Sequence, residues 1–212
     1  MFDIHCHILP EVDDGSRSVQ ESLAMLQKAQ AVGIDTIMCT PHCRWDSFDK
    51  GKVEDAFQLI DEIAAPLGIS LELGYEVNVT KLMSLGIERA PEFALGDTGL
   101  FLLEFNDRAL IPNWQRLIYQ LQGMGLQVII AHPERYRDVQ KSLDIAREMK
   151  ELGCYLQLSA NFIKGGMLDT RRRIATALLK EDLIDYVASD AHRPDDYAVF
   201  AKALEFSRKT AS

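Results

Sequence analysis

The chain has 212 residues, 47% of them hydrophobic, and a formal net charge of −9 at pH 7. This length and apolar content suit one domain over residues 1–212, and the acidic balance argues against nucleic-acid binding, because phosphate backbones are held by many lysines and arginines. No apolar run is long enough to cross a bilayer and no signal peptide is recognisable, so we expect a cytoplasmic protein without membrane insertion.

The four cysteines, Cys6, Cys39, Cys43 and Cys154, lie in or beside apolar runs. Without a secretory context, this placement favours free thiols in a reducing compartment over disulfides. Cys39 and Cys43 could be interpreted as zinc ligands, but a Cys-x3-Cys spacing without a second pair is a weak signal for zinc.

The first predicted strand, residues 2–4, runs directly into a His-x-His pair. Residues two apart on a strand share a face, so His5 and His7 should project together while Cys6 points away. Imidazole is the commonest metal ligand in proteins, so the pair suits a divalent metal. An isolated His-x-His is about equally compatible with a polar strand end.

Strands and helices alternate along the rest of the chain. The capping box Ser18-Val19-Gln20-Glu21 starts a helix that ends near Gly33, and the order helix, glycine, strand recurs further on. The later predicted strands cover residues 34–40, 69–73, 100–104, 126–131, 154–158 and 183–189, and a last helix lies near 195–207. This alternation predicts an α/β fold with parallel pairing, as an open sheet or as a barrel. No glycine-rich phosphate loop follows the first strand, which counts against a dinucleotide-binding fold.

Histidines and carboxylates follow or end almost every predicted strand. In chain order they are His5, His7, Asp14, His42, Glu76, Glu104, His132, Asp190 and His192. The carboxyl ends of the strands in a parallel barrel open on one face, so these side chains would meet in one pocket. A carboxylate in an apolar strand, such as Glu104, is costly to bury unless a cation compensates it. The pattern therefore predicts a metal centre.

Nine candidate ligands are too many for one ion, which takes about four to six, so two or three divalent metals are implied, with a carboxylate such as Glu76 placed to bridge them. The nitrogen and oxygen donors suit manganese, iron or zinc and do not choose among them. Closely spaced metals most often promote displacement at phosphorus, which makes phosphoester hydrolysis the leading chemistry. This reaction needs positive charge on the phosphate oxygens, for which Arg135 is the best-placed candidate, followed by Arg193 and Arg44.

Six spaced motifs between residues 5 and 192 carry a resemblance to a known family. They are His5-Cys6-His7 with Asp13-Asp14-Gly15, Thr40-Pro41-His42, Gly74-Tyr75-Glu76, Leu103-Glu104-Phe105, His132-Pro133-Glu134-Arg135 and Ser189-Asp190-Ala191-His192. In this order they resemble the polymerase and histidinol phosphatase (PHP) superfamily. The resemblance is closer to its bacterial protein-tyrosine-phosphatase branch, whose members accompany capsular and exopolysaccharide synthesis.

The resemblance implies a distorted TIM-like (β/α)7 barrel, a trinuclear site often loaded with manganese, and phosphotyrosine as the substrate. It implies three ligand sets: His5, His7, Glu76 and Asp190 for the first metal, Glu76, Glu104 and His132 for the second, and Asp14, His42 and His192 for the third. It also implies that Arg135 binds the phosphate, and that the substrate is the tyrosine-rich tail of a bacterial tyrosine kinase.

The segment after His192 departs from this branch, whose members tend to carry a longer insert with a second phosphate-binding arginine. Here the segment is short, so either Arg193 substitutes for that arginine or the contact is missing. Two alternative functions stay open: hydrolysis of a small phosphoester such as histidinol phosphate, and a non-catalytic metal-binding or kinase-docking module. Arg171-Arg172-Arg173 is interpreted as a solvated helix face that would also attract a phosphotyrosine-rich tail.

Overall fold

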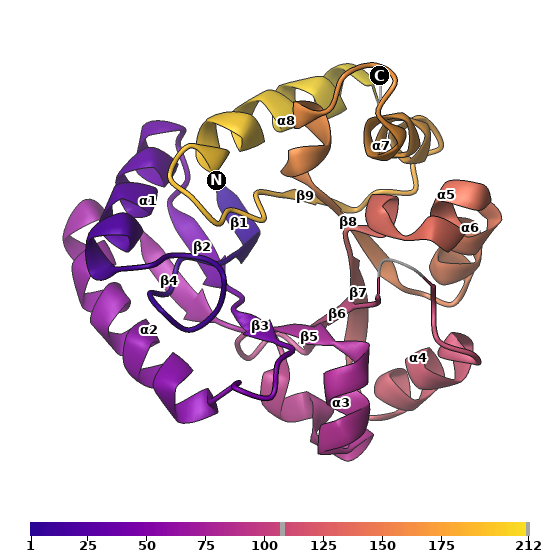
Figure 1. The fold of residues 1–212 in the computed structure, drawn as a ribbon, viewed down its shortest axis with the longest axis horizontal. Coiled ribbons are helices and arrows are strands. Elements are labelled where there is room, and N and C mark those ends of the chain that lie inside the picture. Colours follow the sequence, from indigo (N-terminus) through magenta and orange to yellow (C-terminus); the bar gives the residue numbers. More distant parts are fainter. Residues whose placement is uncertain (107–108, 211–212) are drawn as a thin grey trace.

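The computed structural model describes residues 1–106 and 109–210. Its strands follow one another around a ring, and the helices form a layer outside that ring (Figure 1). The strands are β1 (Phe2–Cys6), β2 (Thr36–Cys39), β3 (His42–Cys43), β4 (Ser70–Leu73), β5 (Glu76–Asn78), β6 (Leu100–Glu104), β7 (Gln127–Ala131), β8 (Tyr155–Ser159) and β9 (Tyr186–Ala188). The α-helices are α1 (Val19–Ala31), α2 (Lys50–Ala64), α3 (Val79–Leu85), α4 (Trp114–Gly123), α5 (Arg137–Lys141), α6 (Asp144–Glu151), α7 (Thr170–Lys180) and α8 (Asp196–Thr210). Short 3-10 helices are η1 (Ala65–Leu67), η2 (Ile87–Phe93), η3 (Pro133–Arg135) and η4 (Ala160–Lys164).

The strands form two hydrogen-bonded sheets with the orders β1-β2-β4 and β3-β5-β6-β7-β8-β9, and neighbouring strands are parallel. The predicted second and third strands each continue into a short strand of the other sheet, β3 after β2 and β5 after β4. Pro41, which lacks an N–H group, lies at the first interruption, and Gly74 lies at the second. Beyond these interruptions His42 and Glu76 face each other as a registered pair of β3 and β5.

Backbone hydrogen bonds continue the ring from β9 to β1. The Asp190 amide donates to the His5 carbonyl at 2.9 Å, and the His7 amide donates to the Ala191 carbonyl at 2.9 Å. Within the described residues, seven strand positions succeed one another around the ring, because β2 and β3 share one position and β4 and β5 share another. The prediction of a distorted TIM-like barrel of the PHP type is confirmed.

The apolar core is divided between the inside and the outside of the ring. On β7, Val128 and Ile130 belong to the large cluster packed against the helices, whereas Ile129 and Ala131 belong to a second cluster. This inner cluster consists of Ile4, Met38, Leu95, Leu102, Ile129, Ala131 and Ala188. Because its strand residues precede the polar residues along β6, β7 and β9, apolar side chains fill the barrel up to its carboxyl end, where the polar side chains begin.

The start and end of α1 agree with the sequence signals. The Ser18 hydroxyl accepts a hydrogen bond from the Glu21 amide at 3.1 Å, and the Glu21 carboxylate accepts one from the Arg17 amide at 2.7 Å. Gly33 takes the left-handed conformation with φ of 85° just beyond the helix. None of the helices in residues 1–106 and 109–210 combines the length and the apolar character that crossing a bilayer requires.

The last strand is shorter than predicted, since β9 begins only at Tyr186. The Leu183 amide still bonds back to the Leu178 carbonyl of α7, so this residue, which lies beyond the helix, closes the helix end instead of pairing in the sheet. The Asp185 carboxylate accepts a hydrogen bond from the Leu156 amide at 2.8 Å and fixes the lead-in to the strand. An apolar pattern alone does not reveal these side-chain and helix-end bonds.

Tyr136 provides a test of how the carboxyl ends of β6 and β7 are held together. Its buried hydroxyl accepts a hydrogen bond from the Phe105 amide at 3.0 Å and donates one to the Ala131 carbonyl at 2.6 Å. We expect Tyr136→Phe to lower the free energy of unfolding by about 2 kcal/mol, because two buried backbone groups lose this partner. Urea unfolding followed by circular dichroism measures the change. The exposed Tyr119 is the control, and Tyr119→Phe should change stability by less than about 0.5 kcal/mol. Equal stability of the two variants would contradict a stabilising role of the two Tyr136 hydrogen bonds.

Candidate metal centre

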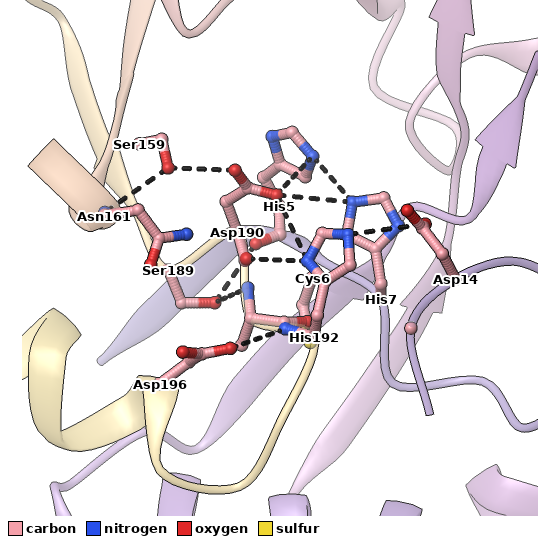
Figure 2. A network of polar contacts seen from close by, with 12 residues as sticks. His5, Cys6, His7, Asp14, Ser159, Asn161, Ser189, Asp190, His192 and Asp196 are labelled. Carbon is pink, nitrogen blue, oxygen red and sulfur yellow. Dashed lines mark hydrogen bonds and ion pairs between the residues drawn. The ribbon is translucent and has the colours of Figure 1, made fainter. Parts of the chain in front are cut away.

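The nine predicted ligands lie together at the carboxyl ends of the strands. They come from β1 (His5), the segment after it (His7 and Asp14), β3 (His42), β5 (Glu76), β6 (Glu104), the residue after β7 (His132) and the segment after β9 (Asp190 and His192). Figure 2 shows five of them converging: His5, His7, Asp14, Asp190 and His192. Seven of the nine are buried, whereas His192 is partly buried and Asp14 lies at the surface.

Glu76 lies at the middle of this cluster and faces four imidazoles. Its Oε2 atom is 2.7 Å from His42 Nδ1, 3.4 Å from His5 Nε2 and 3.5 Å from His7 Nε2. Its Oε1 atom is 2.6 Å from His132 Nε2. Glu76 is thus the carboxylate with the most imidazole neighbours at this site, and its bridging of two metals stays a prediction.

In the described part of the chain, three overlapping groups of side chains have the geometry to hold an ion. The first contains His5, His7 and Asp190. The Nε2 atoms of the two histidines are 3.1 Å apart, and Asp190 Oδ1 is 3.6 Å from the first and 3.5 Å from the second. Together with Glu76, these residues reproduce the first of the implied ligand sets.

The other two groups share His42, and one of them also shares His7 with the first. One contains His42, Glu76 and Glu104, and Glu104 Oε1 is also 3.9 Å from His132 Nε2. The other contains His7, Asp14, His42 and His192. Asp14 Oδ1 lies 3.4 Å from the Nε2 atom of His42 and 3.5 Å from that of His192. His7 and His42 thus each belong to two groups, where the resemblance assigned each of them to a single metal.

In three of the histidines, the hydrogen-bond partner of the ring nitrogen that points away from the cluster fixes the tautomer. It thereby shows which nitrogen presents its lone pair to the cluster. His7 Nδ1 lies 2.7 Å from the Asp13 carboxylate and His192 Nδ1 lies 3.0 Å from the Asp190 carbonyl oxygen, so in the neutral rings both carry the proton there. His5 Nδ1 lies 2.9 Å from the side-chain oxygen of Gln157 in the same manner. The Nε2 lone pairs then point into the cluster, as metal ligation requires.

Buried atoms without a hydrogen-bond partner give a second test of whether these residues suit a metal. Among the described residues, His42 Nδ1 and Glu76 Oε2 are buried and make no hydrogen bond, although they are only 2.7 Å apart. Buried polar atoms are normally paired, and such atoms left facing one another fit a shared cation. The donor set of this chain therefore fits divalent metal ions.

The electrostatics of the cluster favour positive charge. Burial opposes protonation of His5, but Glu76 and Asp190 outweigh it and raise the pKa of His5 to about 10. Burial likewise opposes ionisation of Asp190, yet Arg135 and His5 hold its pKa well below the usual range. A divalent cation competes with protons for the same nitrogen lone pairs. The negative electrostatic potential that favours protonation of His5 therefore also favours binding of a divalent cation.

Cysteine ligation is not supported at this centre. All four cysteines are buried and free, as predicted, and none belongs to the three groups of ligands found among residues 1–106 and 109–210. Burial raises the pKa of Cys43 to about 12, which disfavours the thiolate that zinc binding needs.

Several supporting residues were not identified from the sequence. Asp13 orients His7 and also accepts the His42 amide at 2.9 Å, and Gln157 contacts His5. A Cβ atom on Gly15 would lie 2.2 Å from the His7 carbonyl oxygen, so only glycine lets this loop pack against His7. Gln157 was visible as a polar residue inside an apolar strand pattern, and Asp13 as the neighbour of a predicted ligand.

The three predicted arginines occupy different places. Arg135 donates to Asp190 and, at 2.9 Å, to the Ser159 hydroxyl. Arg44 lies 3.3 Å from Glu104 Oε1 at the edge of the cluster. Arg193 instead donates to the backbone carbonyls of Asp14, Gly15 and His192, which ties the loop after β1 to the segment after β9.

A cavity of about 550 Å³ opens beside the cluster, and we call it the site cavity. It is lined by Arg135, Asn161, Lys164, Gly165, Asp169, Arg171, His192 and Asp196. Lys164 is paired with Asp196 at 2.6 Å and Arg135 with Asp190, whereas Arg171 has no ion-pair partner among the described residues. The site cavity thus combines the candidate ligand His192 with guanidinium groups.

Comparison with known proteins identifies the family of this chain and agrees with the resemblance carried by its sequence motifs. The family model for capsular polysaccharide synthesis, CpsB/CapC, matches residues 1–204. CapC of Staphylococcus aureus is 30% identical over 214 residues, covering 99% of this chain and 84% of that protein. The tyrosine-protein phosphatase YwqE of Bacillus subtilis is 30% identical over 196 residues, covering 91% of this chain and 77% of that protein.

Solved structures extend the comparison. One similar structure belongs to the crystal structures of YwqE from Bacillus subtilis and CpsB from Streptococcus pneumoniae, which are described as unique metal-dependent tyrosine phosphatases. It superposes with a TM-score of 0.88 at 27% identity, and the match covers 100% of this chain and 88% of that one. A β-aspartyl dipeptidase from Fervidobacterium islandicum, 10% identical with a TM-score of 0.56 over 100% of this chain and 68% of that one, shares the fold alone. On the family match and these relatives, the chain belongs to the CpsB/CapC family of capsular polysaccharide synthesis.

Proposed function

We propose that this protein is a metal-dependent protein-tyrosine phosphatase, a single metallohydrolase domain over residues 1–212. The observation that carries the proposal is the cluster of nine histidines and carboxylates at the carboxyl ends of the strands, with His192 and Arg135 lining the cavity beside it. The names of its relatives support the same activity. The proposed substrate is the phosphotyrosine-containing tail of a bacterial tyrosine kinase, in the cytoplasm, where the four free thiols would remain reduced.

The three groups of ligands are proposed to hold two or three divalent ions. Manganese is proposed from the family resemblance, because nitrogen and oxygen donors suit manganese, iron and zinc alike. When bound, these ions supply the Lewis acidity for attack of water on phosphorus and neutralise phosphate charge. Asp13, Gln157 and the Asp190 carbonyl keep the imidazoles in the tautomer that the ions need.

Arg135 supplies the charge that the chain itself brings to the phosphate. Burial disfavours its charged form, but Asp190 and Glu134 outweigh burial and raise the pKa of Arg135, so it stays protonated. Its contacts with Asp190 and Ser159 fix the guanidinium in the wall of the site cavity. A guanidinium held there can bind two phosphate oxygens at once and stabilise the charge of the transition state.

Metal dependence is tested with Glu76→Gln, which removes the charge of the central carboxylate and keeps its shape. We expect this variant to lose at least one ion per chain and its turnover of p-nitrophenyl phosphate to fall by about 100-fold or more. Chelation should abolish wild-type turnover, and manganese should restore it. Glu72→Gln is the matched control, because Glu72 is exposed on the neighbouring β4. Full metal content and turnover in Glu76→Gln would contradict the proposed bridge.

The role of Arg135 is tested with Arg135→Lys, which keeps the charge and loses the planar pair of donors. We expect kcat/KM for phosphotyrosine to fall by about 100-fold, because one preorganised donor set at the transition state is lost. Metal content should stay at the wild-type value, which separates loss of phosphate binding from loss of ligands. Arg137→Lys, at an exposed position two residues on, should behave as the wild type. A variant that turns over normally would remove Arg135 from the proposal.

Substrate class is tested by comparing kcat/KM for a phosphotyrosyl peptide and for histidinol phosphate with manganese present. We expect a preference of about tenfold or more for the peptide, since arginines on the wall of the open site cavity can contact peptide beyond the phosphate. A preference for histidinol phosphate would favour the small-substrate alternative. Bound metal without turnover of either substrate would favour the non-catalytic module.

A further inference from the structure

A second hollow of about 490 Å³ lies between α7 and α8, beside the site cavity, and we call it the α7/α8 groove. Its lining is apolar with a basic rim, formed mainly by Met167, Ala177 and Phe206 and by Arg172, Arg173 and Lys180. Arg172 packs over the Phe206 ring at 5.6 Å and donates to the Gly165 carbonyl at 2.8 Å, so this part of the groove is fixed. The proposed chemistry at the metal centre uses none of these residues.

One segment, residues 164–173, contributes lining residues both to the α7/α8 groove and to the site cavity, although the two hollows have no lining residue in common. Arg171 lines the site cavity, whereas the next two residues, Arg172 and Arg173, line the groove. An extended peptide advances by about 3.3–3.6 Å per residue, so a chain leaving the site cavity over the start of α7 reaches the groove within a few residues. One ligand can therefore occupy both hollows.

Lys164 at the start of this path is paired with Asp196, but three further cations along it have no acidic partner among the described residues. In the described part of the chain, no acidic side chain lies within ion-pair distance of Arg171, Arg173 or Lys180, all of which are exposed. Glu181, the neighbour of Lys180 in sequence, is instead paired with Arg147 at 2.8 Å. A run of unpaired positive charge on a chain of net charge −9 is complementary to an acidic ligand.

Exposed apolar surface accompanies these charges. Met167, which lines the groove, is 84% exposed, and its neighbour in sequence Leu168 is 91% exposed. An apolar side chain seated between Met167 and Phe206 would cover surface that water now contacts. A long polyanion such as single-stranded nucleic acid would gain little there and would be repelled by the acidic remainder of the chain.

We propose that the α7/α8 groove is a docking site for an acidic peptide with one apolar anchor, whose phosphotyrosine enters the site cavity. This inference rests on the proposed phosphatase function and adds that the substrate is recognised beyond its phosphate. The groove sets the affinity for the peptide, whereas the metal centre and Arg135 act on the phosphate.

The test measures binding of a fluorescent acidic peptide that contains one leucine and a non-hydrolysable phosphonate analogue of phosphotyrosine. Fluorescence anisotropy should show Kd raised by about tenfold in the double variant Arg173→Glu/Lys180→Glu, with the difference shrinking as salt screens the charges. Met167→Ser, at an exposed position that leaves the fold intact, should raise Kd by about threefold. Arg116→Glu is the matched control, because Arg116 is an exposed arginine in the first turn of α4, and it should leave Kd unchanged.

Turnover of p-nitrophenyl phosphate by the same preparations separates the two proposals. Groove-dependent peptide binding without turnover would support docking and overturn the phosphatase. Turnover with equal Kd in all variants would overturn docking and keep the phosphatase. Docking would also be overturned if a single-stranded oligonucleotide of equal charge displaced the peptide at equal concentration.

Discussion

The buried carboxylate of Glu76 is the contact on which the rest of the site depends. It lies within 3.5 Å of the nitrogens of four imidazoles, which come from the ends of three strands, β1, β3 and β7. A buried negative charge is tolerated only where cations compensate it, so the four rings and the carboxylate must be assembled together or not at all. The closed order of strands meets this condition, because it brings the ends of β1, β3, β5 and β7 to one point.

A second layer of polar groups converts this assembly into ligands of defined orientation. Asp13 serves two of the histidines, through the ring of His7 and the amide of His42. Asp190 has its carboxylate between His5, His7 and Arg135, while its carbonyl accepts the proton of the His192 ring. One residue thereby couples candidate metal ligands to the arginine proposed to bind phosphate.

The acidic composition of the chain is compatible with a basic surface near α7, because the two kinds of charge lie in different places. The ligand cluster places several carboxylates inside the molecule, where histidines and Arg135 balance them. Outside it, the exposed cations Arg171 and Arg173 remain unpaired among the described residues, next to the site cavity and the α7/α8 groove. An anionic substrate is then attracted to one face of the molecule while the negative net charge disfavours other polyanions.

The sequence by itself determined the alternation of strands and helices and the nine candidate ligands, because each of these is local: a period, a cap, or a residue at the end of a strand. The choice of a barrel over an open sheet came from the resemblance to a known family. Tertiary structure decided which ligands meet. His7 and His42 each join two groups, Gln157 supports a histidine 152 residues away, and Arg193 binds backbone carbonyls rather than facing the site cavity. These contacts depend on the register between strands, on the interruptions at Pro41 and Gly74, and on the junction of β9 with β1. Such features arise only when distant segments pack, and no local pattern encodes them.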